Sequence, residues 1–251
     1  MPYTTIIKDN LWVIPDALPE PVCEYLIKHN ETTMVFKPCT MNKVIDTNYR
    51  DSCEVHIEDH TLARMIWKFV KPYVHVQYQG RKLIGPHYKT FYLLRYGPGQ
   101  QFHQHRDGHS TNSNGQKSFL TALIYLNSDC KGGETRTLMS PRHKLGLEIK
   151  TGADYFDAVP NMGTLVLMRH YLLHASMPMT KGIKYVLRFN ILYENYGPWY
   201  AGGPTNKKFE GVGVNITAPD VPYVNNPIDD AWIKCEDECF QGRRKAPDVY
   251  W

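Results

Sequence analysis

Three side chains in this sequence are spaced so that they could bind one transition-metal ion. Residues 103–109 read HQHRDGH and contain the pair His105-x-Asp107, and His174 follows later in the segment YLLHAS. Positions i and i+2 of a β-strand point to the same face, so His105 and Asp107 can approach one ion while the third ligand comes from another strand. Two histidines and one carboxylate are typical of non-haem iron(II) and leave three coordination positions for a keto acid and O₂. The pattern therefore predicts an oxygen-activating iron site.

Neighbouring histidines compete for these roles. His103 shares the predicted strand face of His105 and could replace it as a ligand. His109 and His170 lie close in sequence to the other two ligands and could be mistaken for them. The spacing alone leaves these alternatives open.

A rival cluster lies at His56, Glu58 and His60. Two histidines four residues apart can grip zinc from one face of a helix, but Ile57 stands where the zinc-protease motif requires glutamate. We therefore interpret His56 and His60 as surface or capping residues.

The segment 184–193 is predicted to be a strand with two different faces. Even positions carry Lys184, Val186, Arg188 and Asn190, and odd positions carry Tyr185, Leu187, Phe189, Ile191 and Tyr193. Such alternation usually marks a strand with one face in water. If the interior of the fold holds an ionic cosubstrate, the polar face points inward instead, and Lys184 or Arg188 would meet a carboxylate.

A second predicted strand, 118–127, could contribute to the same pocket. Thr121, Leu123 and Tyr125 share one of its faces, which offers a hydroxyl and a phenol to a carboxylate. Tyr125 is equally consistent with an ordinary core tyrosine.

The elements that must position these residues can be predicted from apolar spacing. Helical spacing predicts helices over 19–31 and 59–70. Short runs rich in aromatic and β-branched residues predict strands over 88–96, 118–127, 163–168 and 184–193. This order indicates a mainly β fold with flanking helices, a double-stranded β-helix (jelly roll) with the helices on one outer face.

The length of 251 residues fits one domain. We expect a single domain over 1–251, with a partly helical N-terminal support (1–85), a jelly-roll core that carries the site (86–195) and an irregular C-terminal tail (196–251). The tail is rich in Gly, Pro and Asn, which favours irregular structure.

Composition limits the partners. A net charge of +4 without a long basic run gives no argument for nucleic-acid binding, and no apolar stretch approaches the roughly 18 residues of a membrane span. The first twenty residues lack the features of a signal peptide, and six cysteines lack the density of a disulfide scaffold. We therefore expect a cytoplasmic protein with reduced thiols, without a nucleic-acid or membrane partner. The oligomeric state is left open.

Three segments, in this order, resemble the prolyl 4-hydroxylase-like branch of the Fe(II)/2-oxoglutarate-dependent dioxygenases. They read YLLRYGPGQQFHQHRDG, LTALIYLNSDCKGGETRTL and LLHASMPMTKGIKYVLRFNILY, and the likeness runs over residues 88–193. The joint occurrence of three motifs is far more specific than any one of them.

The resemblance implies roles for individual residues. His105, Asp107 and His174 would bind iron, and Lys184, ten positions after the distal histidine, would bind the distal carboxylate of 2-oxoglutarate, with Arg188 as the second candidate. It further implies that Tyr125 shares this carboxylate and that Tyr96, before the glycine turn, lines the pocket. The strand pattern adds the Thr121 hydroxyl to this pocket.

The resemblance implies hydroxylation of an unactivated carbon, with O₂ and 2-oxoglutarate as cosubstrates, succinate as coproduct and ascorbate in support. Asp107 favours hydroxylation, because halogenating relatives leave that coordination position to halide. The substrate would be a prolyl or other amino-acid side chain in a protein or peptide, or alternatively a free amino acid or small molecule. Collagen is not expected, because neither a secretory signal nor a peptide-binding domain is visible.

Two rival functions are compatible with parts of this pattern. A cupin-type dioxygenase would bind iron similarly without a keto acid, but it would not require Lys184 and Arg188. A non-catalytic jelly-roll binding module would keep the metal for stability and recognise a partner through the aromatic tail 196–251. The intact set of three metal ligands favours an enzyme.

Overall fold

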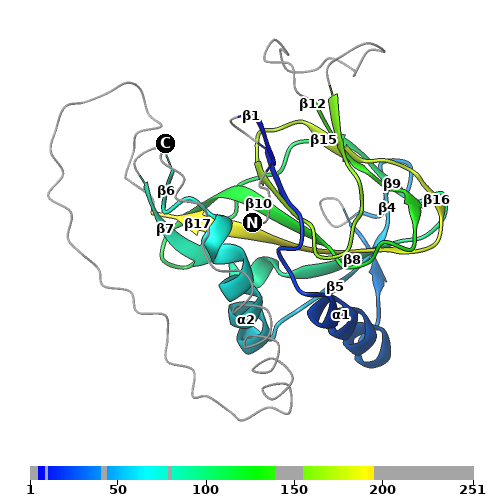
Figure 1. The fold of residues 1–251 in the computed structure, drawn as a ribbon, viewed down its shortest axis with the longest axis horizontal. Coiled ribbons are helices and arrows are strands. Elements are labelled where there is room, and N and C mark those ends of the chain that lie inside the picture. Colours follow the sequence, from blue (N-terminus) through cyan, green and yellow to red (C-terminus); the bar gives the residue numbers. More distant parts are fainter. Residues whose placement is uncertain (1–4, 9–10, 41–43, 79–80, 139–154, 195–251) are drawn as a thin grey trace, which may run out of the picture.

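Two antiparallel sheets are layered in the computed structural model of the chain, which describes residues 5–8, 11–40, 44–78, 81–138 and 155–194 (Figure 1). One sheet has ten strands and the other five, and a separate ribbon has two. Residues from both larger sheets line one cavity, so the sheets face each other. This is the jelly-roll core that the sequence predicts.

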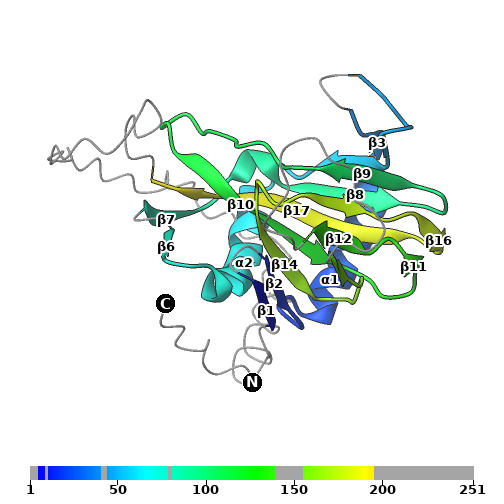
Figure 2. The ribbon, with the colours of Figure 1, turned by 90° about the horizontal axis from the view of Figure 1, so that it is seen from above.

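The large sheet has the strand order β1-β2-β14-β10-β17-β8-β5-β3, with β7 beside β17 and β6 beside β7. Figure 2 shows β17 between β10 and β8 in the middle of the sheet. The strands are β1 (Thr5–Lys8), β2 (Leu11–Ile14), β3 (Lys37–Pro38), β5 (Cys53–His56), β6 (Gln77–Tyr78), β7 (Arg81–Pro86), β8 (Tyr92–Tyr96), β10 (Lys117–Tyr125), β14 (Leu165–Arg169) and β17 (Lys184–Tyr193).

The small sheet has the order β13-β12-β15-β9-β4. Its strands are β4 (Arg50–Asp51), β9 (Gln101–His105), β12 (Thr135–Leu138), β13 (Tyr155–Ala158) and β15 (His174–Ser176), and β11 (Lys131–Gly132) pairs with β16 (Met179–Lys181) in the ribbon. Because β9 and β15 are neighbours, the two predicted histidine ligands lie on adjacent strands.

Two helices cover the outer face of the large sheet (Figure 1). They are α1 (Glu20–Thr33) and α2 (His60–Val70), and short 3-10 helices follow at Lys71–Tyr73 (η1) and Tyr88–Thr90 (η2). The Asp59 side chain accepts hydrogen bonds from the backbone N–H groups of Thr61 and Leu62, at 2.8 and 3.0 Å, and caps α2. Each helix buries one apolar stripe, and Leu26 and Ile66 at the centres of these stripes are fully buried.

The two faces of β17 meet different surroundings. Its odd-numbered side chains, among them Leu187, Phe189 and Ile191, pack in the apolar core against the helices. Its even-numbered side chains Lys184 and Arg188 line the cavity between the sheets. The prediction of an inward-facing polar side is therefore confirmed.

The predicted helices 19–31 and 59–70 are confirmed, as are strands within all four predicted segments. In the segment 88–96, the first residues form the 3-10 helix η2. The strand begins only at Tyr92, where pairing with β17 starts.

The N-terminal part contributes more than helical support. Strands β2 and β5 pair directly with the jelly-roll strands β14 and β8. Strands of four residues carry too little alternation to be recognised alone. The predicted tail 196–251 lies outside the described residues. In the part of the chain that the structure describes, no helix is long and apolar enough to cross a membrane.

Candidate active site

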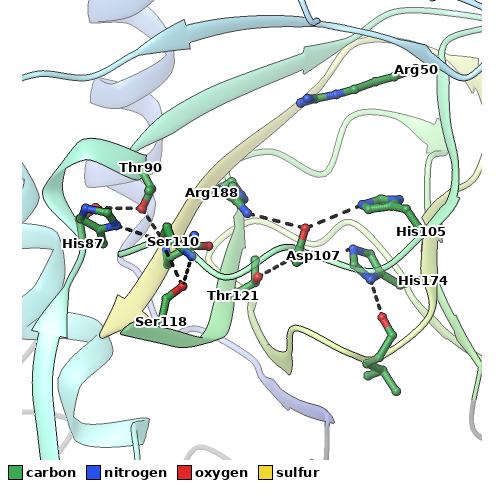
Figure 3. Close-up of polar contacts among 12 residues, drawn as sticks. Arg50, His87, Thr90, His105, Asp107, Ser110, Ser118, Thr121, His174 and Arg188 are labelled. Carbon is green, nitrogen blue, oxygen red and sulfur yellow. Dashed lines mark hydrogen bonds and ion pairs between the residues drawn. The ribbon is translucent and has the colours of Figure 1, made fainter. Parts of the chain in front are cut away.

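The predicted metal ligands lie together at one end of the small sheet (Figure 3). His105 ends β9 and pairs across the strands with His174, the first residue of β15, and Asp107 follows two residues after β9. Asp107 Oδ1 lies 3.8 Å from His105 Nε2, and Asp107 Oδ2 lies 4.0 Å from His174 Nε2. All ligand atoms lie within 4.8 Å of one another, so one ion can touch all three side chains.

Hydrogen bonds orient both imidazoles toward the ion position. His105 Nδ1 lies 2.8 Å from the His103 carbonyl and His174 Nδ1 lies 2.9 Å from the Leu172 carbonyl. Because a carbonyl only accepts, each Nδ1 carries the proton and each Nε2 offers a lone pair. Burial and the neighbouring His174 lower the pKa of His105 to about 3, so His105 is neutral, as a metal ligand must be.

Asp107 is held as a carboxylate. Burial by itself would raise its pKa, but the Arg188 guanidinium, followed by His174, His105 and the Thr121 hydroxyl, holds the pKa well below its usual range. Arg188 Nη2 lies 3.6 Å from Asp107 Oδ1, and Thr121 Oγ1 donates a hydrogen bond to Asp107 Oδ2. Two imidazoles whose Nε2 atoms face one position, together with one carboxylate, form a ligand set that fits iron(II).

The competing histidines lie elsewhere. The His103 ring is exposed and stacks on Tyr49, with ring centroids 6.2 Å apart. His109 Nδ1 donates to the Ser118 carbonyl, and the buried His170 ring lies 5.2 Å from His109. None of these three belongs to the described group of metal-binding side chains.

The rival zinc cluster is absent from the described residues as a metal site. His56 stacks on Tyr92 and pairs with Glu58, whose carboxylate lies 3.2 Å from His56 Nδ1. His60 begins α2 and stacks on Tyr88. The capping role belongs to Asp59 between them.

A cavity of about 430 Å³ opens beside the metal ligands and lies within the usual size range of small-molecule sites. Strands of both sheets form its walls. The lining residues are Thr40, Arg50, Glu54, Tyr92, Leu94, Tyr96, Phe102, His105, Arg106, Asp107, Gly108, Leu123, Thr135, His174, Ser176, Lys184, Val186 and Arg188. A polar end at Lys184 and a polar end at Arg188 are therefore separated by apolar walls.

Lys184 occupies one end of the cavity. Its Nζ donates to the Gly133 carbonyl and to Ser176 Oγ, both at 2.6 Å, and lies 4.3 Å from the centre of the Tyr96 ring. Burial lowers the pKa of Lys184 to about 7. Gly133 has φ +71°, and a Cβ there would clash with Met179 Sδ and lie 3.2 Å from Lys184 Nζ, so only glycine fits beside the amine. A carboxylate bound here would restore the charged form of the amine.

Other predicted cosubstrate residues have different surroundings. Arg188 faces Asp107 at the opposite end from Lys184, and Thr121 holds Asp107. The Tyr125 hydroxyl lies 2.6 Å from Thr135 Oγ1 and 3.0 Å from the Ala158 carbonyl, and Tyr125 and Thr121 do not line the cavity. Tyr125 therefore supports Thr135, which lines the cavity, whereas Tyr96 lines it directly.

Several cavity residues were not anticipated from the sequence, among them Ser176, Thr135 and Arg50. Ser176 stands two positions after His174 on β15, so the i, i+2 rule that linked the metal pair could have found it. Thr135 lies opposite Ser176 on β12, and Arg50 lies on the two-residue strand β4. The last two carry no local signal, because cross-strand register brings them to the site.

Comparison with known proteins agrees with this geometry. Residues 91–192 match the 2OG-Fe(II) oxygenase superfamily. No curated protein matches the sequence. Among solved structures, a prolyl-4-hydroxylase from Pseudomonas putida matches with 14% identity over 74% of this chain and 93% of that chain, with a TM-score of 0.51.

A prolyl hydroxylase from Trichoplax adhaerens, solved in complex with a hypoxia inducible factor oxygen degradation domain peptide fragment, matches with 15% identity. The match covers 74% of this chain and 84% of that chain, with a TM-score of 0.55. At these identities the likeness establishes the fold. With the metal ligands in place and the superfamily match over residues 91–192, these residues form a 2-oxoglutarate-dependent dioxygenase domain, and the chain has a prolyl 4-hydroxylase-like fold.

Proposed function

We propose that this dioxygenase hydroxylates a prolyl or other amino-acid side chain in a peptide or protein. The observation that carries the proposal is the cavity itself, with the metal ligands on its wall and the buried Lys184 at one end. The fold shared with two prolyl hydroxylases, one of them solved with a peptide fragment, supports an amino-acid side chain as the target.

Each protein group has a distinct task in this proposal. Iron(II), held by His105, Asp107 and His174, supplies the oxygen chemistry when it is bound. Lys184 binds the distal carboxylate of 2-oxoglutarate, since a charge-assisted hydrogen bond in a buried site is strong and directional.

The remaining groups position the ligands and exclude water. Thr121 and Arg188 orient Asp107 so that its carboxylate faces the ion position. The apolar side chains Leu94, Leu123 and Val186 line the cavity between its polar ends and limit access of water to the reacting carbon.

The test is oxygen transfer to a defined substrate. The protein would be incubated with iron(II), 2-oxoglutarate, ascorbate and O₂ against a panel of proline-containing peptides and a panel of free amino acids. Succinate and the gain of one oxygen atom would both be measured. We expect peptide hydroxylation that is lost in His174→Ala and retained in the matched control His103→Ala, whose side chain is exposed.

Two results would change the proposal. Oxygen gain by free amino acids alone would assign the enzyme to small-molecule substrates. Retention of activity in His174→Ala would show that the ion is held elsewhere.

A further inference from the structure

The cavity has a second cationic end that binding of 2-oxoglutarate by Lys184 leaves unused. Arg188 lies four residues beyond Lys184 on the same face of β17, which places their Cα atoms about 13 Å apart at 3.3 Å per residue. Lys184 is opposite Tyr96 on β8, whereas Arg188 is opposite Tyr92. The two basic residues therefore face different parts of one cavity.

Arg188 has few protein partners for a guanidinium. Among the described residues its polar side-chain contact is Asp107, 3.6 Å from Nη2, which is beyond hydrogen-bond distance. A guanidinium carries five N–H donors. The remaining donors face the cavity, which Arg188 lines.

Arg50 lines the same cavity from the small sheet (Figure 3), and the groups that feel its charge include Tyr96 at the Lys184 end and also Asp107 and Tyr92 at the Arg188 end. Its guanidinium lies over the Phe102 ring at 4.7 Å, and its Nη2 lies 3.2 Å from Glu54 Oε2. The side chain is 14% exposed, and its buried Nε has no hydrogen-bond partner in the part of the chain that the structure describes. Arg50 is thus held in place by one carboxylate and one ring, with donors left over.

The charges at the cavity do not balance. The described lining residues include four cationic side chains (Arg50, Arg106, Lys184 and Arg188) and two carboxylates (Glu54 and Asp107). Iron(II) and the two carboxylates of 2-oxoglutarate cancel each other. Arg106 is exposed and solvated, and leaving it aside still leaves one positive charge in the filled site. An unpaired charge in such a site is unfavourable, so a negative group on the substrate would complete it.

We propose that Arg50 and Arg188 form a subsite for a carboxylate of the substrate, close to the carbon that is hydroxylated. This inference rests on the proposed function and specifies its substrate class as an amino acid or peptide that carries a carboxylate near the target. The planar forks of two guanidinium groups suit a carboxylate in a way that a neutral amide does not.

The test uses the full chain loaded anaerobically with iron(II) and saturating 2-oxoglutarate. The visible charge-transfer absorption of the iron–2-oxoglutarate complex would be followed during titration with three probe panels. These are N-acetyl amino acids, their neutral amides, and peptides capped at both ends with an internal Asp or Glu. The first panel presents an α-carboxylate, and the third presents a side-chain carboxylate.

We expect at least one carboxylate panel to perturb the absorption with a dissociation constant about tenfold or more below that of the neutral amides, as charge-assisted hydrogen bonds require. The panel that binds identifies the source of the carboxylate. Arg50→Gln should remove this preference, and Arg50→Lys should retain part of it.

Arg95→Gln is the matched control. Arg95 also pairs with a glutamate, Glu31, at 3.0 Å and lies over a phenylalanine ring, Phe36, at 4.4 Å, but it does not line the cavity. Arg95→Gln should keep the wild-type preference for carboxylates over neutral amides. It shows how far the loss of a similar ion pair outside the cavity affects binding.

The outcomes separate the two proposals. If the absorption forms but no carboxylate binds more tightly than its amide, the carboxylate subsite is wrong and the hydroxylase proposal stands. The subsite is equally wrong if Arg50→Gln keeps the preference. If the absorption never forms, the hydroxylase proposal fails and the subsite falls with it.

Discussion

The two faces of β17 are both buried, yet they serve opposite purposes. The odd-numbered face lies in a dry core, where Phe189 stacks on Phe91 with ring centroids 4.3 Å apart. The even-numbered face places Lys184 and Arg188 in a polar cavity. The odd-numbered face stabilises the fold through apolar burial. The even-numbered face buries charged groups, which costs folding free energy but places these groups where they can bind ligands. Alternation in a strand therefore does not by itself mean contact with water.

The largest expected effect lies on the apolar face. Phe189→Ala removes a fully buried ring from the core and should lower the free energy of unfolding by about 3–5 kcal/mol. Denaturant unfolding of the metal-free protein would measure it. The dissociation constant of 2-oxoglutarate, measured below the new unfolding midpoint, should change little, and a large change would contradict the separation of the two faces.

The next effect lies on the polar face. Lys184→Met keeps the length of the side chain but removes the charge, so the dissociation constant of 2-oxoglutarate should rise about 100-fold. Because the buried amine is replaced by an apolar group, the unfolding midpoint should fall little or rise. Lys181→Met, at an exposed position, is the control. If Lys184→Met bound 2-oxoglutarate as tightly as the wild type, another residue would have to bind the distal carboxylate.

A smaller effect is expected where β10 supports the metal ligand. Thr121→Val conserves shape but removes the hydrogen bond to Asp107, and iron(II) affinity should fall about tenfold. Anaerobic titration with iron(II) would measure this change. Thr137→Val, a buried threonine on β12 that does not line the cavity, should leave the affinity as it is.

The smallest effect is a pH dependence. The pKa of Lys184 is lowered to about 7, so above pH 7 most of the ligand-free protein has a neutral amine that must gain a proton when a carboxylate binds. The dissociation constant of 2-oxoglutarate should therefore rise about fivefold from pH 7 to pH 8 and level off below pH 7. His105, with a pKa of about 3, does not titrate in this range.

Lys184→Arg tests the cause of that dependence. Arginine stays charged throughout, so any 2-oxoglutarate binding that remains should be independent of pH between 7 and 8. A wild-type slope in this variant would assign the titration to another group.

Local spacing was enough to predict several features of the site. The His105-x-Asp107 pair, the two helices and the opposed faces of β17 follow from periods of two and 3.6 residues, which act between near neighbours in the chain. His174 and Lys184 were already candidates from the residue pattern, and the resemblance to the dioxygenases gave them the roles of distal iron ligand and 2-oxoglutarate ligand. The structure brings all four to one cavity.

Other features depend on register between distant strands. Tyr125 was expected to contact the cosubstrate, but it faces Thr135 and Ala158 because β12 and β13 approach β10 at that point. Arg188 was a candidate for 2-oxoglutarate, but its place four residues along β17 puts it beside Asp107.

The sequence by itself determined which residues share a strand face and therefore which side chains can act together over a few positions. Only the tertiary structure decided that Lys184 and Arg188 reach different parts of one cavity and that Arg50 lines the same cavity from the other sheet. The physical reason is that side-chain direction follows from local backbone geometry, whereas the meeting of β4, β9 and β17 depends on hydrogen-bond register and on packing between two sheets.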